Sequence, residues 1–103
     1  MTSVIVAPEA RADVARIIAH LASVASLATA SRWNDRLWSA IDEIAEFPGS
    51  GAPRPQLGAN VRIKIVTPYL IIYEHVRGAD TADVLRVVHG RRRITTKLLR
   101  EIG

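Results

Sequence analysis

The chain of 103 residues has no cysteine, which excludes disulfide bonds, thiolate metal sites and cysteine nucleophiles. It also has no apolar run near the roughly 18–20 residues that a membrane span requires. No acidic cluster accompanies His20 or His75 in the sequence, and Gly49-Ser50-Gly51 does not follow a strand as a phosphate-binding loop would. We therefore expect a cytoplasmic protein with no membrane association, no metal and no cofactor.

Lysine is also scarce, because arginine supplies twelve of the fourteen basic residues. Residues 1–50 carry four arginines against six acidic groups, a net charge of −2, whereas residues 51–103 carry a net charge of +6. The guanidinium group suits two-point contacts with phosphate or carboxylate. The second half is therefore expected to present a positive surface to a polyanion or to an acidic peptide. Its arginines cluster at residues 91–93.

Length and composition indicate a single domain over residues 1–103, with 49% hydrophobic residues to form a core. Apolar spacing predicts two helices, at about residues 8–22 and 28–46, joined by a turn at 23–27. It predicts strands at 4–6, 61–65, 69–76 and 82–89, a loop at 48–60 and a short final helix from residue 94. The order β-α-α-β-β-β-(α) predicts an α+β fold with an α-helical hairpin on one face of a small antiparallel sheet.

Alternation along residues 61–65 assigns the core and the opposite surface. Arg62 and Lys64 are expected to point away from the hairpin, on a sheet face left free for function. The expected contacts between the hairpin and the sheet join Ile17, Leu21, Leu37, Ile41 and Ile44 to Ile63, Ile65, Ile71 and Leu85.

In this order, several short motifs resemble the ParE/RelE superfamily of toxins from type II toxin–antitoxin systems. The motifs are Ala7-Pro8-Glu9-Ala10, Ile44-Ala45-Glu46-Phe47-Pro48, Gly58-Ala59-Asn60-Val61-Arg62, Pro68-Tyr69-Leu70-Ile71-Ile72-Tyr73 and Val84-Leu85-Arg86-Val87-Val88-His89-Gly90-Arg91-Arg92. The resemblance covers nearly the whole chain. It implies a toxin that arrests bacterial growth and helps to stabilise plasmids. The implied partner is a cognate antitoxin with an acidic and apolar segment that folds on binding, in a hetero-oligomer.

RelE-like members of this superfamily are ribosome-dependent mRNA endonucleases, and their pattern is incomplete here. Arg62 and Lys64 match two basic positions and Arg92 matches a third, but Leu70 stands where the pattern has an arginine. The pattern also has a late tyrosine, and this chain has none after position 73. For metal-free RNA cleavage, Lys64 or His89 would have to transfer the protons, because a guanidinium group such as that of Arg62 stays protonated.

These departures favour the ParE-like branch, whose members bind and inhibit DNA gyrase without chemistry of their own. The alternatives are a RelE-like endonuclease acting on the ribosome and mRNA, and a non-toxic adaptor that binds nucleic acid or protein. For the gyrase interpretation we expect one converging target-binding patch. Its residues are Arg62, Lys64, Tyr69, Arg86, His89, Arg91, Arg92 and Arg93.

Overall fold

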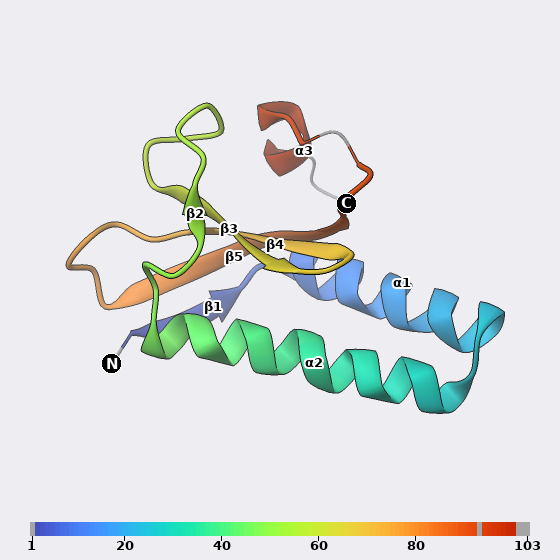
Figure 1. Cartoon of the computed structure of the whole chain (residues 1–103). Helices are drawn as coiled ribbons and strands as arrows, with labels where there is room; N and C mark the ends of the chain where they lie inside the picture. The colour runs from blue at the N-terminus through green and yellow to red at the C-terminus, as the bar shows by residue number, and fades with distance from the viewer. Residues whose placement is uncertain (1, 93, 101–103) are drawn as a thin grey trace.

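The computed structural model describes residues 2–92 and 94–100. Two long helices cover one face of a five-stranded sheet, and a short helix lies over the other (Figure 1). The elements are β1 (Ser3–Val6), α1 (Pro8–Val24), α2 (Leu27–Glu46), β2 (Ala52–Pro53), β3 (Val61–Val66), β4 (Tyr69–Glu74), β5 (Thr81–His89) and α3 (Thr96–Arg100). The predicted α+β class and the helical hairpin are confirmed.

The hairpin is longer than its sequence pattern suggested. Pro8 occupies the first turn of α1, where its missing N–H costs nothing. The Ser26 hydroxyl caps α2 by accepting a hydrogen bond from the Thr29 N–H at 3.0 Å. The connection between the helices is therefore only residues 25–26, shorter than the predicted turn at 23–27.

The strand order in the sheet is β1-β5-β4-β3-β2. β1 runs parallel to β5, and the other neighbouring strands are antiparallel. The edge strand β2 pairs Ala52 with Ile63 and Pro53 with Arg62, within a stretch predicted to be loop. Two residues that include a proline carry too little strand propensity to be recognised in the sequence.

The larger core lies between the hairpin and the sheet. Leu37, Ile41 and Ile44 are buried there against Ile71, as predicted. Ile17 packs at the margin of this core, and Leu21 is half-buried outside it.

Three of the four sheet contacts predicted for the hairpin are wrong. Ile63 is buried on the opposite face, and the side chain of Ile65 is 62% exposed. Leu85 is half-buried and is not among the side chains of the hairpin-side core; it lies at a register irregularity, where Ile72 pairs with Arg86 but Tyr73 pairs with Val84. Alternation along β3 correctly predicted which side chains share a face of the sheet, but it assigned the apolar ones to the hairpin side when they face α3. The pattern determines which side chains lie on the same face and does not determine which helix covers that face.

The sheet face opposite the hairpin is covered, contrary to the prediction that it is free. Val61, Ile63, Ile72 and Val88 form a second buried cluster there with Leu98 of α3. Partly buried side chains at its margin are Leu57, Leu70, Ile94 and Leu99. α3 thus forms a thin third layer.

Candidate functional site

The candidate site is one end of the sheet, where the β3–β4 turn meets the end of β5. We call it the basic end and define it by Tyr69, His89, Arg91 and Arg92. Tyr69 and His89 are cross-strand partners, and the Gly90 N–H donates to the Pro68 carbonyl at 2.7 Å. A Cβ on Gly90 would lie 3.1 Å from that same oxygen, so the close turn favours glycine.

An aromatic row connects the basic end to α2. The rings of Trp33 and Tyr69 meet edge-to-face at 5.2 Å, and those of Tyr69 and His89 at 5.7 Å. The Arg36 guanidinium lies 4.5 Å from the centre of the Trp33 ring, within cation–π range. Burial raises the pKa of Tyr69 above its ordinary value of 10.0. Its phenol is therefore a neutral hydrogen-bonding group at physiological pH.

Two shallow cavities flank the end of β5. One, of about 270 Å³, lies against the apolar parts of Ile65, Pro68 and Leu70 and is bordered by His89 and Arg91. The other, of about 260 Å³, is lined by both Arg54, from the loop after β2, and Arg92. Apolar walls with arginines at their margins suit an acidic partner with apolar anchors.

Hydrogen bonds within the basic end constrain its imidazole. The Arg91 N–H donates to His89 Nδ1 at 3.1 Å, and the Arg92 N–H donates to the His89 carbonyl at 2.9 Å. An accepting Nδ1 assigns the proton of the neutral ring to Nε2. The Nδ1 lone pair is thus engaged by the Arg91 N–H, so the geometry does not favour His89 as a general base.

Arg62 and Lys64 lie elsewhere, and their predicted convergence with Arg91 and Arg92 is wrong. Both point to the hairpin side of the sheet. Lys64 Nζ forms an ion pair at 2.9 Å with Glu43 of α2, and Arg62 donates to loop carbonyls at the opposite end of β3. The predicted patch also included Arg93, which is outside the described residues.

Arg86 was also predicted to contact a target, but it is buried and only 5% exposed. Its Nε donates to Asp13 Oδ2 at 2.7 Å, and its Nη2 donates to Asp13 Oδ1 at 2.9 Å. Asp13 also accepts the Val87 N–H at 3.0 Å. A residue with this buried partner is part of the structural framework, because exposing it would leave the aspartate charge uncompensated.

Sequence reasoning missed Asp13, Arg36 and Arg54. Asp13 directly precedes Val14 in the first helix, and both residues are buried. The sequence does carry a signal for this pair: an aspartate beside Val14 and an arginine within the apolar run 84–88 are each costly to bury unless they pair. No comparable signal brings Arg36 or Arg54 to the basic end, since both are distant from it in sequence.

The described residues form a small α+β domain, with a helical hairpin on one face of a sheet and a basic end. A family model described as the ParE toxin of the type II toxin–antitoxin system parDE matches residues 4–94, and the chain belongs to this family. Its structure is similar to a chain of the chromosomal ParDE toxin–antitoxin system from P. aeruginosa, with a TM-score of 0.73. That match has 19% sequence identity and covers 86% of this chain and 96% of the other, which supports the fold. Among curated proteins, no sequence matches the chain.

Residues 2–92 and 94–100 offer neither a membrane span nor a metal cluster. No helix there combines the length and apolarity that crossing a membrane requires. Nor do those residues bring together three histidine, cysteine, aspartate or glutamate side chains that could hold a metal ion.

Proposed function

We propose that this chain is a ParE-like toxin that inhibits DNA gyrase by binding, with the basic end as its docking surface. Membership of the ParE family supports this function. The observation that carries it is the separation of the residues that RNA cleavage would need. Lys64 is engaged by Glu43 on the hairpin side, whereas His89 and Arg92 lie at the end of β5.

The remaining chemistry at the basic end also favours binding over catalysis. The His89 ring, whose Nδ1 is an acceptor, can make hydrogen bonds without transferring protons. Tyr69 was predicted to contact the target, but it is only 7% exposed and belongs to the hairpin-side core, so it supports the His89 ring from below. Leu70 contributes apolar surface to both flanking cavities, at the position where the endonuclease pattern has an arginine. Apolar contact with surrounding arginines is the pattern of a protein–protein docking site.

The first test is controlled expression in bacteria. We expect growth arrest with DNA breaks and filamentation, and inhibition of purified gyrase in a supercoiling assay. Specific mRNA fragments with unimpaired gyrase would contradict the proposal and favour the endonuclease. Normal growth with a folded, well-expressed chain would favour the non-toxic adaptor.

Two sets of variants then separate docking from catalysis. Lys64→Arg and His89→Gln retain charge and hydrogen bonding, respectively, but remove proton transfer, so both should stay toxic. A catalytic role would instead lower activity by about 10²–10⁴-fold. The double variant Arg91→Glu with Arg92→Glu should abolish toxicity. The matched control is Arg11→Glu with Arg32→Glu, which changes net charge equally at exposed positions of the hairpin.

We further propose that a cognate antitoxin with an acidic and apolar segment neutralises the chain, in a hetero-oligomer. A stretch of exposed strand edge supports this. β2 pairs only with Arg62 and Ile63, so in the described structure no strand flanks residues 64–66 of β3 on that side. Unpaired edge groups beside the 62%-exposed Ile65 suit an added strand.

The antitoxin proposal is tested with the product of the neighbouring gene. Ile65→Lys should weaken the complex about tenfold or more, because it places a charge among apolar contacts. Val76→Lys is a matched control, since Val76 is 53% exposed and lies away from this edge. The toxin should also be more soluble and melt at a higher temperature with its partner than alone. Equal affinity of the two variants would place the antitoxin on another surface.

A further inference from the structure

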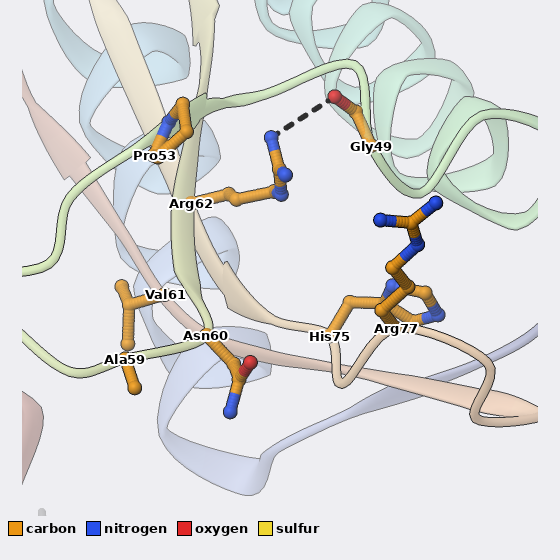
Figure 2. A pocket seen from close by; sticks show the side chains of 8 residues that line it. All are labelled: Gly49, Pro53, Ala59, Asn60, Val61, Arg62, His75 and Arg77. Carbon is orange, nitrogen blue, oxygen red and sulfur yellow. Dashed lines mark hydrogen bonds between the residues drawn. The ribbon is translucent and has the colours of Figure 1, made fainter.

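A cavity at the other end of β3 gathers cationic side chains that the proposed function does not use. Its volume is about 340 Å³, and it lies between the loop after α2, the start of β3 and the loop after β4. Figure 2 shows Arg62 on one side and His75 with Arg77 on the other. We call this cavity the Arg62 pocket. It is separate from the basic end, because Arg62 pairs with Tyr73 whereas His89 pairs with Tyr69 at the opposite end of β4.

Backbone carbonyls hold the Arg62 guanidinium in one orientation. Its Nη1 donates to the Gly51 carbonyl at 2.7 Å and to the Gly49 carbonyl at 3.1 Å, and the second bond is drawn in Figure 2. Both hydrogens of that nitrogen are thereby engaged, which leaves the Nε and Nη2 donors for another acceptor. Within residues 2–92 and 94–100, neither Arg62 nor Arg77 forms an ion pair with a carboxylate.

The loop that supplies these carbonyls is itself held by a buried phenol. Tyr73 Oη donates to the Pro48 carbonyl at 2.7 Å and accepts the Gly51 N–H at 2.9 Å. A Cβ on Gly51 would lie 2.7 Å from that phenol oxygen, so the loop packs against it without room for a side chain. Arg62 is therefore oriented before any ligand arrives, which lowers the entropic cost of binding.

The opposite wall is a turn with its own internal bonds. The His75 N–H donates to the Asn60 carbonyl at 3.0 Å, and His75 Nε2 lies 3.3 Å from the Ala79 carbonyl oxygen. The turn closes through the Ala79 N–H, which donates to the Val76 carbonyl at 2.9 Å. It presents Arg77 across the pocket from Arg62 (Figure 2).

We propose that the Arg62 pocket binds a phosphate group. Two guanidinium groups on opposite walls place N–H donors on both sides of the space, and the His75 imidazole lies beside Arg77. A tetrahedral phosphate presents oxygens to several donors at once, whereas one planar carboxylate matches a single guanidinium edge. A doubly charged phosphate also compensates two arginines that lack ion-pair partners among the described residues. The site does not depend on the identity of the toxin's target.

The test is calorimetric titration of the purified full-length chain with inorganic phosphate, at constant ionic strength and with chloride as the reference anion. Arg77→Gln should weaken binding about tenfold or more, because it removes one charge-assisted contact. It lies in an exposed turn, so the variant should fold normally. Arg62→Lys keeps the charge but loses the two-point geometry and should weaken binding similarly.

Arg32→Gln is the matched control, since it removes the same charge from an exposed position on α2. Titrations with a nucleoside triphosphate and with a short single-stranded oligonucleotide identify the source of the phosphate. Tighter binding of either compound than of inorganic phosphate, with the same dependence on Arg77, supports the site and names its ligand. Absence of phosphate binding by the wild-type chain, or equal binding by Arg77→Gln and Arg32→Gln, would overturn the proposal.

Discussion

The two faces of the sheet are covered to different extents. Helices of 17 and 20 residues cover one face, and a helix of five residues covers the other. Among the described residues, the hairpin-side cluster holds twelve buried side chains and the opposite cluster five. The segment with Arg91 and Arg92 leads directly into the thin layer. Arg91 and Arg92, which belong to the surface proposed to bind the target, are therefore connected to the face with fewer buried contacts.

One buried ion pair connects the two faces. Arg86 lies on β5 and binds Asp13 of α1, while its Nη1 donates to the Leu98 carbonyl of α3 at 2.9 Å. The Asp13 carboxylate also accepts the Val87 N–H, beyond the last β1–β5 pair at Val84. The Asp13 carboxylate thus satisfies a backbone N–H of β5 that has no β1 partner, and Arg86 links α3 to the hairpin.

Removing this connection should have the largest effect. Asp13→Ala leaves the buried Arg86 charge without its carboxylate, which should lower the free energy of unfolding by about 3–5 kcal/mol. Denaturant unfolding measures the change, and Arg16→Ala is the control, because Arg16 is the exposed partner of Asp13. A loss as small as that of the control would mean that the pair does not join the two faces.

The same leucine-to-alanine substitution on each face tests whether the two faces contribute differently to stability. Leu37→Ala, in the hairpin-side core, should cost about 2–5 kcal/mol. Leu98→Ala should lower the free energy of unfolding by only about 2 kcal/mol, because a five-residue helix can shift to fill the cavity that the substitution leaves. Hydrogen exchange should show faster exchange in α3 than in α1 and α2. Equal losses and equal exchange protection would contradict the proposed weakness of the α3 layer.

The smallest effect should come from the phenol that holds the loop after α2. Tyr73→Phe keeps the buried ring but leaves the Gly51 N–H and the Pro48 carbonyl without their partner, at a cost of about 1–2 kcal/mol. Thermal unfolding measures the change. Because the carbonyls of this loop orient Arg62, the variant should also weaken phosphate binding. Unchanged phosphate affinity in the destabilised variant would show that the loop does not orient the arginine.

The sequence by itself determined the elements and the class of this protein. Apolar spacing located the helical hairpin and the three longer strands, because periods of 3.6 and 2 are local properties of the chain. The order of the elements and the short motifs pointed to the ParE family, which the family model confirms. Arginine enrichment after residue 50 indicated a positively charged second half, as the described arginines at both ends of β3 illustrate.

Only the tertiary structure decided which cations share a surface. Arg62, Lys64 and Arg86 are predicted to share one patch with Arg91, yet in the fold Arg62 binds loop carbonyls, Lys64 pairs with Glu43 and Arg86 is buried against Asp13. Alternation cannot choose between two covered faces, and it cannot reveal that Asp13 meets Arg86 across 73 positions. A charge is assigned its role by the groups that surround it after folding, and those groups come from distant parts of the chain.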